Sequence, residues 1–256
     1  MSALKTFVKP FAKPFVIPKK PHGLRETEGD RMTFIVGMHC DKGLVLCSDS
    51  LESDNYDKRN VKKLFHYDRA DWGVAWGCAG DSDVIHRFTE KLQIMMDKES
   101  DDVDWLGLQL LIESVAHELH DRYERALLQI IAGVWLRNPM TLKLCRMDVL
   151  HGNCLSVEDD YACAGMDLSL GKFVLGNLWS KSLSAEMALN LAVLVTQMMK
   201  KTADGVGGPT QLVTCEFPGA GWKDRANSFI RKHEHENAVE DIAELIQQYW
   251  LTNFPS

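Results

Sequence analysis

Residues 33–50 read TFIVGMHCDKGLVLCSDS and decide the fold class. Two apolar, β-rich runs, 33–40 and 44–50, flank the short Gly-bearing turn at 41–43. This pattern predicts an antiparallel hairpin. The globular part of the chain therefore begins with paired strands.

The hydrophobic period sorts the rest of the chain into strands and helices. After the hairpin, strands are expected over 61–67 and 72–79, followed by helices around 84–95 and over 105–125. Strands then follow over 127–136, 142–148 and 153–157, helices over 167–179 and 184–202, a strand over 211–216 and a last helix over 238–251. Asp81 or Ser82 can cap the helix around 84–95, and Ser184 can cap the helix over 184–202. Strand blocks separated by helix pairs favour two antiparallel sheets face to face, with helices outside both. The prediction is an α+β fold, a four-layer αββα sandwich.

Composition narrows the class of protein. The chain has 256 residues, of which 45% are hydrophobic and 25% charged, as in an ordinary globular protein. Eighteen apolar residues nowhere run together, and the first twenty lack the apolar core of a secretory signal. The seven cysteines are odd in number and never spaced as CxxC, which indicates buried thiols in a reducing compartment. We expect a cytoplasmic protein without membrane association.

Charge divides the chain into a basic tail and an acidic body. Residues 1–21 hold five lysines, four of the eight prolines and no acidic side chain, so the rest carries 24 basic against 36 acidic side chains. The prolines prevent a helix, and residues 1–31 are interpreted as a leader before a domain at 32–256. Such a leader is either a solvated extension or a contact for an anionic partner. The acidic body argues against nucleic-acid binding.

Motifs for metals and cofactors are lacking, and neither is expected. The histidines of His117-Glu118-Leu119-His120 are three positions apart, whereas the HExxH zinc motif needs four. The tract 233–236 is a weak metal candidate, and the glycines of 205–208 have no Lys-Ser/Thr sequel for a phosphate loop.

Several segments, in order, resemble proteasome-type subunits of the N-terminal-nucleophile hydrolase superfamily. They are the strand start at 33–37, the strand GLVLCSDS at 43–50, VKKL at 61–64, CAGDSD at 78–83 and GGP at 207–209. The resemblance spans about residues 33–216. It implies the four-layer sandwich, a peptide or unfolded-protein substrate, a homo-oligomeric ring and an ATPase as a possible partner.

Carried onto this chain, the resemblance implies Thr33 as nucleophile, with Asp49 and Lys63 as its catalytic partners. A free α-amino group on Thr33 would accept the hydroxyl proton, and a positive Lys63 would lower the pKa of that amine. Asp49 would orient Lys63. Backbone N–H groups at Ala79 and Gly80 would stabilise the oxyanion. The expected reaction is amide hydrolysis through an ester on Thr33.

The chain departs from the family pattern at two positions where the family has polar residues, because this chain has Ala164 and Val206 there. Met32, rather than glycine, precedes Thr33. Three states follow for residues 1–32: autolysis after Met32, translation from Met32 with removal of that methionine, or a retained leader that leaves the protein latent or inactive.

By position, the family's first specificity pocket would be formed by Glu52, Val61, Phe65, Gly77 and Asp81. Its acidic character favours a basic or large residue before the scissile bond. Two alternatives to the peptidase remain. One is a catalytically inactive proteasome-fold scaffold that retains its leader, and the other is a transpeptidase or ligase that passes the acyl group to an amine.

Overall fold

A computed structural model describes residues 33–53, 58–123, 127–150, 154–165, 168–216 and 221–224. The proposed leader, the tract 233–236 and the expected helix 238–251 lie outside these residues. The described elements are, in chain order, β1 (Phe34–Cys40), β2 (Gly43–Ser48), β3 (Leu51–Ser53), β4 (Lys58–Asn60), β5 (Leu64–Asp68), β6 (Trp72–Gly80), α1 (Ser82–Met96), α2 (Trp105–Arg122), β7 (Leu128–Arg137), β8 (Met140–Asp148), β9 (Ser156–Glu158), β10 (Tyr161–Gly165), α3 (Leu168–Leu178), α4 (Ala185–Thr202), β11 (Gln211–Glu216) and β12 (Lys223–Asp224).

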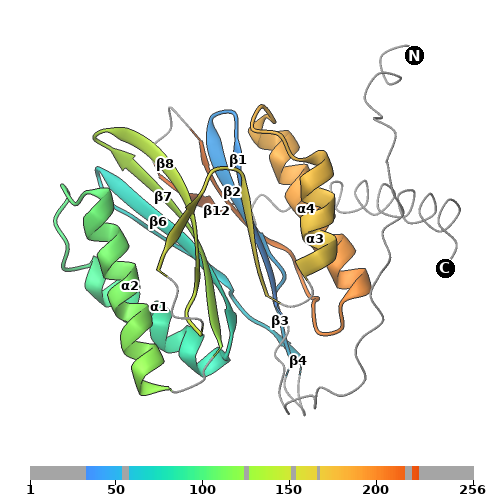
Figure 1. The fold of residues 1–256 in the computed structure, drawn as a ribbon, viewed down its shortest axis with the longest axis horizontal. Coiled ribbons are helices and arrows are strands. Elements are labelled where there is room, and N and C mark those ends of the chain that lie inside the picture. The colour runs from blue at the N-terminus through green and yellow to red at the C-terminus, as the bar shows by residue number, and fades with distance from the viewer. Residues whose placement is uncertain are drawn as a thin grey trace, which may run out of the picture.

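These elements form four layers, as the sequence predicts (Figure 1). One five-stranded sheet has the order β10-β1-β2-β11-β12, and the other has the order β5-β6-β7-β8-β9. Helices α1 and α2 cover the second sheet, and α3 and α4 cover the first. A separate two-stranded sheet, β3-β4, lies at one end of the sandwich.

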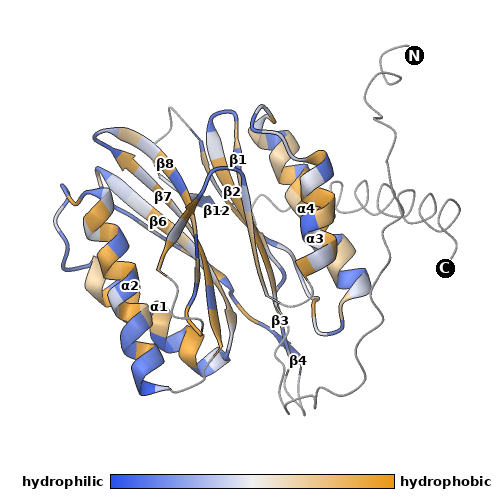
Figure 2. Ribbon diagram, viewed as in Figure 1, coloured by the Kyte–Doolittle hydropathy of each residue, from blue (hydrophilic) through white to orange (hydrophobic). Residues whose placement is uncertain are grey.

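Three hydrophobic clusters fill the three spaces between these layers. In β1, Phe34, Val36 and Met38 pack under α3 and α4, whereas Ile35 faces the opposite sheet. Both faces of the strand are thus buried, which explains its continuous apolar run. Gly37 lets the two sheets approach closely, because a Cβ there would lie 2.6 Å from the Leu144 side chain. Figure 2 shows the resulting hydrophobic character of the strands in both sheets.

The element boundaries differ from the predicted ones at a few places. Ser184 caps α4 by accepting a hydrogen bond from the Met187 N–H at 3.2 Å, which confirms the predicted cap. Asp81 is the N-cap residue of α1, but its carboxylate accepts the Leu127 N–H at 2.9 Å instead of capping the helix. The sequence patterns did not predict β3, β4, β10 or β12.

Six of the seven cysteines are buried, as expected for small apolar side chains, and Cys154 is exposed. Burial raises the pKa of the thiols of Cys145, Cys163 and Cys215 to about 12. These thiols therefore stay protonated at neutral pH. Among the described helices, none has the length and apolar content needed to cross a bilayer.

Candidate active site

The structure brings Thr33, Asp49 and Lys63 together at one end of the sandwich. Each follows or precedes a strand: Thr33 comes before β1, Asp49 follows β2, and Lys63 comes before β5. All three are buried, with Thr33 and Lys63 each 6% exposed and Asp49 fully enclosed. Three polar residues from separate strand ends thus share one buried position, where unpaired polar groups are costly.

Lys63 is the centre of this group. Its Nζ donates to Thr33 Oγ1 at 3.0 Å, to Asp49 Oδ1 at 3.0 Å and to the Leu51 carbonyl oxygen at 2.5 Å. Burial lowers the pKa of Lys63 below its usual value, and the nearby Asp49 carboxylate opposes that shift. A lysine in this state is a stronger proton donor than a solvated one.

Asp49 holds the site together through backbone contacts. Its Oδ1 accepts the Phe34 N–H at 3.0 Å, and its Oδ2 accepts the N–H groups of Leu51 at 3.2 Å and Gly207 at 3.1 Å. The carboxylate therefore fixes the start of β1 and the approach to β11 while pairing with Lys63. The 207–209 motif quoted from the sequence contributes to the site through the backbone of its first glycine.

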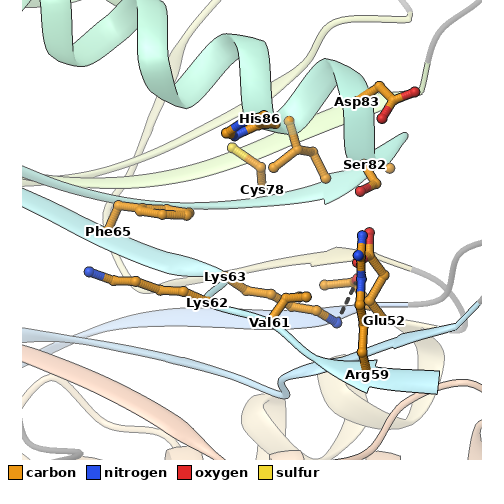
Figure 3. Close-up of a pocket in the computed structure, with 13 residues that line it drawn as sticks. Glu52, Arg59, Val61, Lys62, Lys63, Phe65, Cys78, Ser82, Asp83 and His86 are labelled. Carbon is orange, nitrogen blue, oxygen red and sulfur yellow. Dashed lines mark hydrogen bonds and ion pairs between the residues drawn. The ribbon is translucent and has the colours of Figure 1, made fainter.

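A pocket of about 310 Å³ opens beside Thr33 and Lys63. Its remaining lining comes from the β3–β4 hairpin, the β5 segment, the end of β6 and the start of α1; the residues are Glu52, Arg59, Val61, Lys62, Phe65, Cys78, Gly80, Ser82, Asp83, Ile85 and His86. Figure 3 shows Lys62 and Lys63 extending in opposite directions, Lys63 toward Glu52 and Arg59. Glu52 is paired with Arg59 at 2.6 Å, and the Arg59 side chain is 68% exposed.

Three of the five residues predicted for the specificity pocket line it, namely Glu52, Val61 and Phe65. Gly77 faces the space between the sheets, where a Cβ would lie 2.7 Å from the Leu64 side chain. Asp81 turns toward Leu127. Cys78 and Ser82, each one residue further along, occupy the lining instead.

The residues predicted to bind the oxyanion end β6. Gly80 lines the pocket with φ +129°, a backbone conformation that glycine adopts most easily. The Ala79 side chain points into the core between the sheets. Gly80 is therefore the member of this pair that borders the space next to Thr33.

The two departures from the family pattern are apolar and buried in the structure. Ala164 belongs to the core between the sheets, and Val206 packs under α4. Asp204, the nearby carboxylate, is exposed. Ala164 and Val206 therefore supply no hydroxyl or carboxylate group at these positions.

The structure also shows a polar residue that the sequence motifs did not reveal. Gln211, at the start of β11, hydrogen-bonds the backbone on both sides of Lys62, through Val61, Lys63 and Leu64. Alternation along the strand could have indicated it, because Gln211, Val213 and Cys215 lie on the same face, and that face packs against the other sheet.

Within the described ranges, no group of three or more His, Cys, Asp or Glu side chains is arranged to hold a metal ion. The site consists of a hydroxyl, an ammonium group and a carboxylate beside a pocket. Together with the four-layer sandwich, it defines the class of N-terminal-nucleophile folds.

Comparison with known proteins agrees with this class. The family model described as "Proteasome subunit" matches residues 31–214, and the chain belongs to the proteasome subunit family. A comparison with curated proteins finds no match.

Three similar solved structures carry the name Anbu. They are an ancestral beta-subunit from Yersinia bercovieri (TM-score 0.72), a Gly-1 mutant from Hyphomicrobium sp. strain MC1 (0.70) and a helical assembly of the Anbu complex from Pseudomonas aeruginosa (0.70). Each is 16% identical to this chain, and each match covers 88% of this chain and 98% of the other. At this identity the likeness supports the fold.

Proposed function

We propose that this chain is a threonine-type peptidase that cleaves peptides or unfolded proteins once Thr33 is its N-terminal residue. The observation that carries the proposal is the buried Lys63 Nζ, which lies 3.0 Å from both Thr33 Oγ1 and Asp49 Oδ1 beside a pocket. Activity then depends on removal of the residues before Thr33, or on their never being made.

The proposed reaction has two steps. The Thr33 hydroxyl attacks the substrate carbonyl, and its proton passes to the Thr33 α-amine, directly or through a water, and then to the leaving amine. The positive charge on Lys63 keeps the pKa of that α-amine low. The N–H groups of Ala79 and Gly80 are proposed to stabilise the oxyanion, a contribution of about 2.7–4 kcal/mol per donor in other hydrolases. Water then hydrolyses the ester.

Mass spectrometry with a threonine-directed β-lactone or epoxyketone tests the proposal. The purified protein is expected to contain a species that starts at Thr33 and gains the mass of one probe. The Thr33→Ala variant is expected to gain none, because it lacks the attacking oxygen. A full-length protein that never reacts with the probe would contradict the peptidase and favour the scaffold.

The scaffold alternative is favoured by one observation. The apolar Ala164 and Val206 are buried at positions where the resemblance implies polar partners for the terminal amine. A retained leader would leave Thr33 without a free amine. The ligase alternative uses the same ester and is recognised by a joined peptide when an amine acceptor is added.

The pocket leads to a prediction about specificity. Glu52 lines the pocket in a pair with Arg59, whose side chain is 68% exposed, and we propose that a basic residue before the scissile bond displaces Arg59 and pairs with Glu52 instead. Glu52→Gln is expected to lower kcat/KM for Arg and Lys peptides about tenfold, with little change for Leu peptides, since one partly screened charge pair is lost. A fluorogenic panel measures this ratio. Equal cleavage of basic and neutral peptides by the unmodified protein would contradict it.

We also propose that copies of this chain assemble, with a cytoplasmic location and an ATPase as a possible partner. Support for assembly comes from large apolar side chains on the outer helices: Ile94, Leu106 and Leu110 are each more than half exposed. Exposed apolar side chains on neighbouring helices are typical of contact surfaces. The Pseudomonas aeruginosa structure is described as a helical assembly.

A further inference from the structure

The side chain of Gln211 bridges the two sheets next to the candidate site. Its Oε1 accepts the N–H groups of Lys63 at 2.8 Å and Leu64 at 3.1 Å, and its Nε2 donates to the Val61 carbonyl oxygen at 2.5 Å. The amide oxygen thus faces two donors and the amide nitrogen faces an acceptor, which is the only orientation that satisfies all three groups.

These three hydrogen bonds serve the segment that leads into β5, where the backbone has no neighbouring strand to pair with. Residues 61–63 form neither helix nor strand, and β5 begins only at Leu64. The Val61 N–H also donates to the Ser50 carbonyl oxygen just beyond β2, at 2.8 Å, and the Lys63 side chain reaches Thr33 and Asp49. Buried backbone groups need partners, and here one side chain supplies three of them.

The three residues of the candidate site adjoin different sheets. Thr33 and Asp49 adjoin β1 and β2 of the first sheet, whereas Lys63 adjoins β5 of the second. Gln211 belongs to β11, which pairs directly with β2, Gln211 lying opposite Ser48. A side chain anchored to the sheet of Thr33 and Asp49 therefore holds the backbone of Lys63.

We propose that Gln211 is a positioning residue that sets the distance from Lys63 Nζ to Thr33 and Asp49. The effect of Gln211 on catalysis rests on the proposed peptidase function, whereas its effect on the position of Lys63 does not. The Gln211 side chain does not line the pocket, so it is proposed to act through Lys63 rather than on the substrate.

Two substitutions separate length from polarity. Gln211→Met keeps the length of the side chain and removes all three hydrogen bonds. Gln211→Asn keeps the amide and shortens its reach by one methylene. Both are expected to slow probe labelling of Thr33 about 10- to 100-fold, because small misplacements of catalytic groups have effects of this size.

The pH profile of labelling distinguishes positioning from a general loss of stability. If Lys63 moves away, the pKa of the Thr33 α-amine rises, and the acid limb of the profile shifts to higher pH by about half a unit or more. The other charged or titratable side chains around Lys63 and the pocket are Asp49, Glu52, Arg59, Lys62, Asp83 and His86, and these variants leave all of them in place.

Thr196→Val is the matched control. Thr196 is fully buried between α4 and β2, where its hydroxyl contacts Cys47 Sγ and the Ala192 carbonyl oxygen, and it does not line the pocket. The Gln211 variants and Thr196→Val are all expected to lower the melting temperature, because each loses buried or partly buried hydrogen bonds, but Thr196→Val is expected to leave the pH profile unshifted.

Amine footprinting of the full chain tests the hold on Lys63 without any activity. Acetic anhydride modifies exposed lysines, and Lys62, which is exposed, serves as the internal reference. Gln211→Met is expected to raise acetylation of Lys63 relative to Lys62 several-fold. An unchanged ratio would overturn the proposal.

The two failures are distinguishable. If the unmodified chain never labels at Thr33, the peptidase fails, and the footprint still decides whether Gln211 holds Lys63. If the chain labels and Gln211→Met has the same rate and pH profile, the peptidase stands and the positioning role is overturned.

Discussion

Replacing Lys63 with methionine is expected to reduce probe labelling of Thr33 by about a thousandfold or more, as removal of one member of a catalytic unit does in other hydrolases. Lys63 donates directly to Thr33 Oγ1, and the substitution removes the positive charge that keeps the pKa of the α-amine low. Labelling rates followed by intact mass measure this loss. A Lys63→Met protein that labels within tenfold of the unmodified rate would contradict the assigned role.

The same substitution is expected to destabilise the fold. Asp49 would keep its three backbone donors and lose its ion-pair partner in a position without solvent contact. Breaking a buried pair by removing one partner costs about 3–5 kcal/mol, and the remaining donors place the expected loss at about 3 kcal/mol. Urea unfolding measures it. Lys62→Met, at the exposed neighbouring position, is the control and is expected to change the free energy of unfolding by less than about 1 kcal/mol, the size of the exposed cation–π contact that it loses with Phe65.

The pH dependence of stability provides a second readout for Lys63. Its pKa is lowered in the folded protein, mainly by burial, so between that value and the ordinary 10.5 the unfolded chain binds more protons than the folded one. The free energy of unfolding contributed by this group therefore rises with pH through that window. Lys63→Met is expected to lack this rise. An identical alkaline slope in both proteins would show that folding does not lower the pKa of Lys63.

The fold could be predicted largely because the deciding strands are buried on both faces. The run at 33–40 is apolar throughout since β1 packs between α3, α4 and the second sheet, and such a run is visible in a sequence. Strand β10 escaped prediction because its residues, YACAG, are mostly small and lack β-branched side chains. Strands β3 and β4 have three residues each, too few for a period.

The sequence motifs predicted the residues around Lys63, but they could not predict which residues of a strand face the pocket. Two adjacent lysines on a strand edge could both face solvent as far as the sequence shows, but the structure buries Lys63 while Lys62 stays exposed. In β6, alternate residues face opposite sides, so a difference of one residue in the β5–β6 connection exchanges Gly77 for Cys78 at the pocket. The spacing of motifs along the sequence cannot show which of these two residues faces the pocket.

Gly165→Ala is expected to disturb both stability and the nucleophile. Gly165 ends β10 opposite Phe34, and its backbone has φ +113°. A Cβ at this position would lie 1.7 Å from the Thr33 carbonyl oxygen and 2.8 Å from its carbonyl carbon. The contact is with backbone rather than with a flexible side chain, so either Thr33 or the end of β10 must move.

The movement is resisted from the other side of the sandwich. The Gly165 N–H donates to Gln129 Oε1 at 2.8 Å, and Gln129 in turn bonds Asp148. Strand β10 is thus fixed to the second sheet, and the displacement passes to Thr33. Strained backbone and overpacking each cost about 1–3 kcal/mol, so the expected loss of stability is about 2–6 kcal/mol. Thr33 labelling is expected to fall about 100-fold, since the hydroxyl leaves its place beside Lys63.

Gly176→Ala provides the matched control, because Gly176 lies on the exposed side of α3, where a Cβ would meet only the Tyr161 hydroxyl, at 3.3 Å. Alanine in a helix interior is favoured over glycine by about 0.5–1 kcal/mol, so this variant is expected to be at least as stable as the unmodified protein and to label normally. Urea unfolding and labelling rates compare the two. If Gly165→Ala matched Gly176→Ala in both, the close approach of β10 to Thr33 would have no part in placing the nucleophile.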